Sequence, residues 1–173
     1  LFLANVPKGS GIAFVIVQHL DPTHKGIMVE LLQRATAMKV VQVKDRMKIG
    51  PDQVYVIPPN RDMSILHGTL HLFEPAAPRG LRLPIDFFFR SLAQDLHEHA
   101  IGIVLSGTGS DGTLGIRAIK GEGGMIMAQT PSTTEYDGMP RSAIGTGLVD
   151  YELSPAEMPA RLISFVRTAA NGP

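Results

Sequence analysis

Short apolar runs alternate with longer, periodically apolar stretches along the chain, and this pattern predicts strands and helices in turn. Continuous apolar runs are typical of strands that are covered on both faces. Such runs lie at residues 12–17, 54–57 and 125–128, and similar runs with one interruption lie at 40–43, 101–105 and 148–151. Apolar residues spaced three or four apart indicate amphipathic helices. They predict helices over residues 25–37, 85–99 and 113–120, a short helix opening at 138–141, and a last one from the capping box at 154–157 to residue 166.

The order of these elements predicts the fold class. Strands that alternate with helices favour a doubly wound α/β fold, with a mostly parallel sheet and helices on both faces. Residues 64–73 differ, because they alternate around the turn His67-Gly68-Thr69 and so predict an antiparallel hairpin at the sheet edge. Two core stripes are expected on the helices, formed by Met28, Leu31, Leu32 and Ala35 and by Phe88, Leu92 and Leu96.

Composition narrows the class further. The 173 residues suit one domain, residues 1–173, with a substantial core; 44% of them are apolar and the formal net charge is zero. We therefore expect neither a nucleic-acid surface nor membrane insertion. The absence of cysteine excludes disulfides and thiolate metal sites, and a reducing, cytoplasmic location is the simplest expectation.

The first residues of the chain suggest what precedes them. Leu1 is the first residue, and residues 1–7 resemble the tail of a helix. We expect that a strand and a loop precede them in the natural protein.

Residues 106–112, with the sequence SGTGSDG, form the most informative stretch. They follow the apolar run 101–105 and precede the predicted helix 113–120, so they form a glycine-rich loop at the carboxyl end of a strand. Ligands and catalytic groups gather at such loops in α/β proteins.

Two interpretations of this loop compete. Gly107, Gly109 and Gly112 fit the dinucleotide pattern G-x-G-x-x-G. Two observations oppose this interpretation. The next strand ends in Gln129-Thr130 and not in the acidic residue that would bind the ribose. Asp111 would also place a negative charge beside the negatively charged pyrophosphate. In the second interpretation the glycines shape the turn and Asp111 does the chemistry. Ser110 or Asp111 could also simply cap the helix that follows.

A histidine completes the second interpretation. His19 follows the buried run 12–17, as Asp111 follows the run 101–105, and the ends of parallel strands meet at one sheet edge. A His oriented by a carboxylate is the base half of a nucleophilic triad, so we expect an Asp111 oxygen within about 3.2 Å of a His19 ring nitrogen. Ser10 lies before its strand, and neither Ser106 nor Ser110 sits in a nucleophile elbow.

Three segments together give a family resemblance. Gln18-His19 after one strand, residues 107–112 after another, and Gly138-Met139-Pro140-Arg141 further on resemble the methylesterase domain of bacterial chemotaxis systems, over nearly the whole chain. The sequence of residues 85–92, IDFFFRSL, is most similar to that of methylesterase domains fused to a receptor methyltransferase domain. The resemblance implies hydrolysis of glutamate methyl esters on chemoreceptors, and deamidation of certain glutamines, without a metal or organic cofactor.

The resemblance also implies roles for residues. His19 matches the general base and Asp111 its orienting carboxylate. The family's serine nucleophile lies in a Gly-Ala-Ser-x-Gly-Gly loop that is not found here and is expected upstream of Leu1, so residues 1–173 alone are expected to be inactive. Thr108 departs from the Met common in stand-alone members. The positions expected to support the site are Gln18, Thr108, Gly109, Gly112, Met139 and Arg141.

The implied partners are the cytoplasmic helices of methylated chemoreceptors and a covalently linked methyltransferase domain. Asn60 and Arg141 could contact the receptor helix or could serve only as structural hydrogen bonders. The alternatives from other classes are a nucleotide-binding regulatory module and a catalytically silent interaction domain of a sensory protein.

Overall fold

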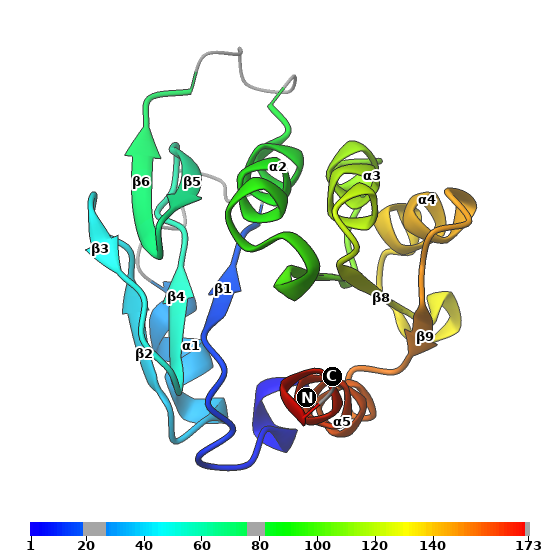
Figure 1. The fold of residues 1–173 in the computed structure, drawn as a ribbon, viewed down its shortest axis with the longest axis horizontal. Coiled ribbons are helices and arrows are strands. Elements are labelled where there is room, and N and C mark those ends of the chain that lie inside the picture. The colour runs from blue at the N-terminus through cyan, green and yellow to red at the C-terminus, as the bar shows by residue number, and fades with distance from the viewer. Residues whose placement is uncertain (19–26, 76–81, 172–173) are drawn as a thin grey trace.

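The structure is a computed structural model that describes residues 1–18, 27–75 and 82–171. Parallel strands lie in the middle, with helices on both sides of them (Figure 1). The predicted α/β class with parallel strands, helices on both faces and an antiparallel hairpin is confirmed.

The parallel strands form two groups of three. The first has the order β1-β4-β2, from Phe14–Ile16, Gln53–Val56 and Lys39–Gln42. The second has the order β7-β8-β9, from Ile101–Val104, Met125–Gln129 and Tyr151–Leu153. β8 is buried along its whole length, as a strand covered on both faces must be.

The predicted hairpin is present, but it belongs to a separate sheet. Strands β5 (Asp62–Leu66) and β6 (Thr69–Phe73) pair antiparallel, and the short β3 (Met47–Lys48), which the apolar pattern did not reveal, pairs with β6. His67 and Gly68 both have positive φ, as a two-residue hairpin turn requires. The hairpin therefore packs as its own layer beside α2 instead of extending a parallel sheet.

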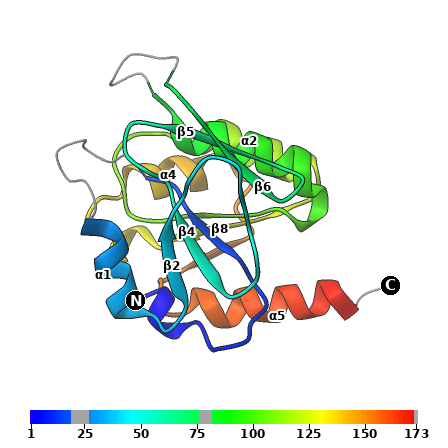
Figure 2. The same ribbon diagram turned by 90° about the vertical axis from the view of Figure 1, so that its left-hand side faces the viewer.

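Helices cover two faces and enclose two apolar clusters. The helices are α1 (Ile27–Ala35), α2 (Pro84–Leu96), α3 (Thr113–Gly121), α4 (Gly138–Gly145) and α5 (Met158–Asn171). One cluster joins α2, α3 and α4 to the hairpin. The other lies on the opposite face, where residues of α1, α5 and the short 3-10 helix η1 (Leu3–Asn5) pack on the parallel strands (Figure 2).

Some predicted details were wrong. β9 begins at Tyr151 and not at residue 148, because Asp150 is used in a turn: its N–H donates to the Ile126 carbonyl and its carboxylate accepts the Ile126 N–H. In α1, Met28 and Leu32 face the core, while Leu31 is half exposed and Ala35 is exposed.

The capping box was also interpreted wrongly. Helix α5 begins at Met158, after a turn over residues 155–157. The Ser154 hydroxyl donates to the Glu157 carboxylate at 2.6 Å, so the two side chains of the box contact each other, and Pro159 lies in the first turn of the helix in place of Pro155.

The close approach of α2 and α3 depends on Gly115. A Cβ at this position would overlap Phe89 Cβ and lie 3.0 Å from Phe89 Cδ2. Gly115→Ala is therefore expected to lower the free energy of unfolding by about 1–3 kcal/mol. Gly121→Ala in the same helix is the control, because a Cβ there meets nothing within 4 Å, and it should change stability by only about 0.5 kcal/mol. Denaturant unfolding of both variants checks this, and equal losses would contradict the packing argument.

Within the part of the chain that the structure describes, we find no helix long and apolar enough to cross a bilayer.

Candidate active site

The glycine-rich loop, residues 106–112, connects β7 to α3. Gly109 and Gly112 have φ angles of 83° and 102°, in the left-handed region that side chains disfavour. The glycines therefore give the loop its shape, as the second interpretation of the sequence requires.

A second loop, after β8, holds the first one in place. The Gly107 N–H donates to the Tyr136 carbonyl at 2.9 Å, and the Met139 N–H donates to the Gly107 carbonyl at 2.8 Å. The Ser106 hydroxyl accepts the Tyr136 N–H at 3.0 Å and lies 3.2 Å from the Tyr136 carbonyl. Gln129, at the end of β8, is buried and accepts the Ser106 N–H at 2.9 Å. The two loops thus form one fixed unit.

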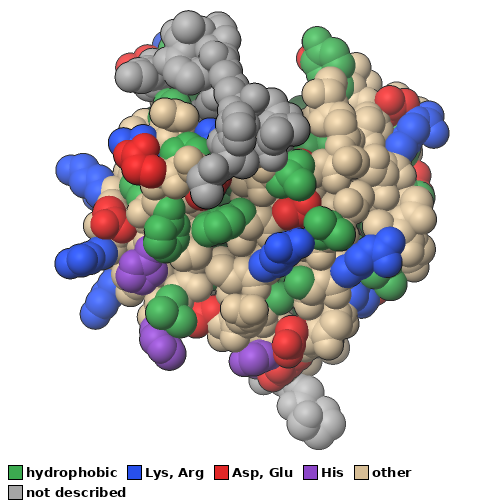
Figure 3. Space-filling model, turned by 90° about the horizontal axis from the view of Figure 1, so that it is seen from above, with side chains coloured by type: hydrophobic (Ala, Val, Ile, Leu, Met, Phe, Trp, Pro, Cys, Tyr) green, Lys and Arg blue, Asp and Glu red, His purple; other side chains and the backbone are tan. Residues whose placement is uncertain are grey.

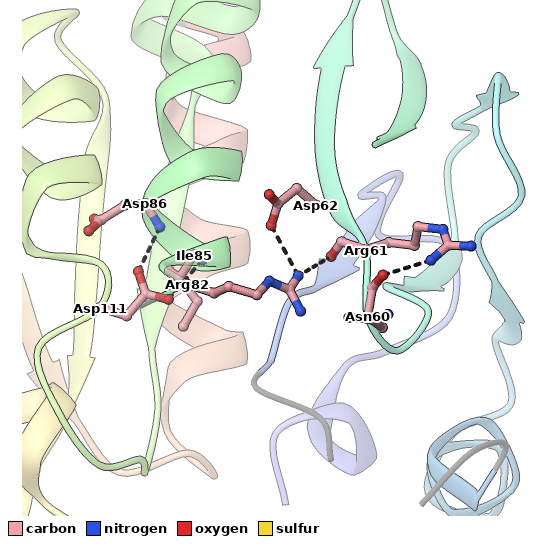
Figure 4. Close-up of polar contacts among 7 residues, drawn as sticks. All are labelled: Asn60, Arg61, Asp62, Arg82, Ile85, Asp86 and Asp111. Carbon is pink, nitrogen blue, oxygen red and sulfur yellow. Dashed lines mark hydrogen bonds and ion pairs between the residues drawn. The ribbon is translucent and has the colours of Figure 1, made fainter. Parts of the chain in front are cut away.

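The Asp111 carboxylate caps a helix that begins earlier in the chain. Its carboxylate accepts the N–H groups of Ile85 at 3.0 Å and Asp86 at 2.9 Å, so it caps α2 from another part of the chain (Figure 4). The N-cap position of α3 is Gly112, which makes no side-chain cap. Only 4% of Asp111 is exposed. The two bonds from Ile85 and Asp86 thus tie the Asp111 carboxylate to a helix that begins earlier in the chain.

The Asp86 side chain, in turn, contacts the start of α3. Its Oδ1 accepts the Gly115 N–H, in the first turn of α3, at 2.7 Å. Burial raises the pKa of the Asp86 carboxyl, the hydrogen bond from Gly115 opposes the rise, and the nearby Asp111 charge adds to it. A pyrophosphate at the start of α3 would meet both carboxylates, and the Gly115 N–H is already used. The arrangement therefore disfavours the dinucleotide interpretation of the loop.

Arg82 connects this corner to the start of β5, which follows β4 after a short loop. Its Nη2 donates to the Arg61 carbonyl at 2.7 Å and to Asp62 Oδ1 at 3.0 Å, and both side chains of the Arg82–Asp62 pair are largely buried. Figure 4 shows the Arg82 side chain reaching from the start of α2 to the segment that follows β4. The Asp111 carboxylate and the loop that joins β4 to β5 thus lie on one side of the molecule.

The end of β1 lies at the same edge. β1 and β4 run parallel, with Ile16 opposite Val56, and the Ile57 N–H donates to the Ile16 carbonyl at 3.0 Å. Gln18 follows β1, and its Nε2 is buried without a hydrogen-bond partner among the described residues. His19 lies outside the described residues, so its contact with Asp111 stays a prediction.

The remaining predicted site residues fall into two groups. Gly109, Gly112 and the buried Met139 belong to the interlocked loops, and the Met139 side chain packs on Gly107. Thr108 is exposed on the glycine-rich loop, residues 106–112.

The second group lies on the surface outside that loop. Arg141 is exposed: its Nε pairs with Asp137 Oδ2 at 2.6 Å, and this bond lowers the pKa of the Asp137 carboxyl. Asn60 is exposed and follows β4, beside Arg61.

Two candidate hydroxyls have structural roles. Ser10 lies before β1, at the opposite end of that strand, where its hydroxyl accepts the Ile12 N–H at 3.3 Å. Ser106 is engaged with Tyr136 as described above. Ser10 thus lies at the end of β1 away from His19, and the Ser106 hydroxyl is held by Tyr136.

The sequence alone does not mark Asp86 or Arg82 as parts of this corner. Asp86 occupies the first turn of a predicted helix, where acidic residues are common for electrostatic reasons, so its type alone gave no signal. Arg82 lies in a proline-rich stretch whose path the sequence does not determine.

Comparison with known proteins agrees with this architecture. The family model described as CheB methylesterase matches residues 1–162. The crystal structure of the Thermotoga maritima CheB methylesterase catalytic domain is similar with a TM-score of 0.86 and 27% identity, covering 95% of this chain and 89% of that one.

Two relatives are considerably longer than this chain. A protein-glutamate methylesterase/protein-glutamine glutaminase of Anaeromyxobacter dehalogenans is 32% identical over 175 residues, which cover 96% of this chain and 50% of the relative. An uncharacterized 104.1 kDa protein of Rhodobacter capsulatus is 48% identical over 126 residues, which cover 73% of this chain and 13% of the relative. The chain thus spans half or less of these two proteins. The match along its sequence and the similarity of its fold show that it belongs to the CheB methylesterase family.

Proposed function

We propose that this chain is the catalytic domain of a protein-glutamate methylesterase that removes methyl groups from the glutamates of chemoreceptor helices in the cytoplasm. The observation that carries the proposal is the position of Asp111. Its buried carboxylate is fixed by two backbone donors on the side of the molecule where β1 ends, three residues before His19.

The proposed chemistry is acyl transfer. A serine upstream of Leu1 attacks the ester carbonyl, and His19 takes its proton. Asp111 holds the imidazole in the correct tautomer and stabilises the imidazolium. Backbone N–H groups bind the oxyanion, methanol leaves with the proton that His19 returns, and water then hydrolyses the acyl-enzyme. Attack on a glutamine side chain would follow the same course and release ammonia.

The surface beside Asp111 supports docking of a receptor helix. Leu83, Phe87 and Phe73 are 46%, 41% and 46% exposed. The Phe87 N–H donates to the Leu83 carbonyl, and the Phe73 and Phe87 rings meet edge to face at 5.9 Å. Figure 3 shows hydrophobic side chains interspersed with charges of both signs on the upper face of the molecule. An amphipathic helix offers the complementary mixture of side chains.

The size of the Rhodobacter capsulatus relative supports a larger protein around this domain. The matched region is only 13% of that relative, so a domain of this kind occurs there within a much longer chain. We propose that the natural protein carries a linked methyltransferase domain, with a nucleophile loop upstream of Leu1.

Methanol release tests the proposal. The natural full-length protein is expected to release methanol from methylated receptor fragments, whereas residues 1–173 alone are expected to release none. Robust turnover by residues 1–173 would show that the nucleophile lies within them. A full-length protein that binds receptor without releasing methanol would favour the silent interaction domain instead.

A further inference from the structure

The starts of α2 and α3 cap each other. Asp111, directly before Gly112 and α3, accepts two N–H groups of α2, while Asp86 in α2 accepts the Gly115 N–H of α3. Neither helix has a side-chain cap from its own N-cap residue, Leu83 or Gly112. The two aspartates therefore replace the local caps, and each helix start depends on the other.

Asp86 takes part in both halves of this exchange. Its backbone N–H donates to Asp111 Oδ1 at 2.9 Å, and its own Oδ1 accepts from Gly115 at 2.7 Å. The first bond holds the Asp111 carboxylate directly. The second holds the turn of α3 that begins two residues after Asp111.

From this arrangement we infer that Asp86 is a positioning residue for the esterase reaction, which fixes the Asp111 carboxylate through the Gly115 N–H and the start of α3. The inference rests on the proposed function. Asp86 touches neither substrate nor reacting atoms in this scheme, since it is 4% exposed and lies behind Asp111.

The Asp86 carboxyl lies in an electrostatically unfavourable place. Its carboxyl is buried, and the charges that act on it are those of Asp111, which is unfavourable, and Arg90, which is favourable. Two neighbouring buried carboxylates are costly to ionise together. An asparagine would offer the Gly115 N–H the same acceptor oxygen without that cost. Positioning of the Asp111 carboxylate therefore requires the hydrogen bond from Gly115 and not the charge of Asp86.

Asp95 provides a matched control. It lies in the same helix, and its carboxylate also accepts backbone N–H groups, those of His67 at 2.7 Å and Gly68 at 3.3 Å. These belong to the hairpin turn and not to the site. Loss of Asp95 should therefore lower stability without moving Asp111.

The test compares Asp86→Ala, Asp86→Asn, Asp95→Ala and Asp95→Asn in the natural full-length protein, by methanol release. Asp86→Ala should lower kcat by about 10- to 100-fold with little change in KM, since a small misplacement of a catalytic group has effects of this size. Asp86→Asn should retain kcat within about threefold, and Asp95→Ala within about twofold. Hydrogen exchange at the Ile85 and Asp86 amides should accelerate in Asp86→Ala and not in Asp95→Ala.

Specific outcomes would overturn the inference. It fails if Asp86→Ala keeps full kcat, if Asp86→Asn loses as much as Asp86→Ala, or if Asp95→Ala loses kcat equally. Should Asp86→Ala not fold, Asp86→Glu carries the same test, because its longer side chain displaces the acceptor oxygens. An inactive unmodified protein would remove the proposed function, whereas unchanged amide exchange in Asp86→Ala would remove this inference independently of activity.

Discussion

Replacement of His19 by alanine is expected to abolish methanol release by the natural full-length protein. A serine hydroxyl is a poor nucleophile near neutral pH unless a base takes its proton. Loss of the histidine base should lower kcat by about 10⁴-fold or more. Because backbone N–H groups of α2 and α3 hold the Asp111 and Asp86 carboxylates, and His19 donates none of these bonds, the unfolding midpoint should change little.

His24→Ala is the control for this substitution. His24 lies five residues beyond His19 in the sequence, past Asp21-Pro22, and is expected to have no part in catalysis. It should leave kcat and KM close to those of the unmodified protein. If both histidine variants lost activity to the same extent, His19 could no longer be assigned as the base.

The fold was largely predictable because apolar runs report burial directly. Residues 125–128, for example, coincide with the fully buried strand β8, and the turn His67-Gly68 was predicted from its chemistry. The predicted start of a strand was wrong where the local sequence suited both a strand and a turn. Residues 148–151 are apolar enough for a strand, but Asp150 bonds to Ile126 and delays β9 to Tyr151.

The candidate site was predictable only in part. The loop 106–112 and Asp111 stand out in the sequence, because a glycine-rich loop after a buried strand is a recognisable signal. The partners of this carboxylate cannot be found in the sequence, since Ile85 and Asp86 lie 26 and 25 residues away. The spacing of apolar residues predicts each helix but does not indicate which two helices pack together. The mutual capping of α2 and α3 is a property of the tertiary arrangement alone.

Asp111 caps α2 and is also the proposed orienting carboxylate, and substitutions should separate these two roles. Asp111→Ala removes both acceptors and leaves the buried N–H groups of Ile85 and Asp86 unpaired. We expect the free energy of unfolding to fall by about 2–4 kcal/mol. We also expect kcat to fall by about 10⁴-fold, the size of effect seen when a triad loses its carboxylate.

Asp111→Asn keeps one acceptor oxygen for α2 but has no charge to stabilise an imidazolium. It should therefore lose nearly as much kcat as Asp111→Ala while losing less stability. Asp52→Asn is the control: Asp52 also accepts a backbone N–H, from Gly11 at 2.9 Å, but lies at the opposite end of β4. It should leave kcat unchanged. If Asp111→Asn kept full activity in methanol release, while Asp111→Ala lost both activity and stability, Asp111 would be a helix cap only, and its assignment as the orienting carboxylate would be wrong.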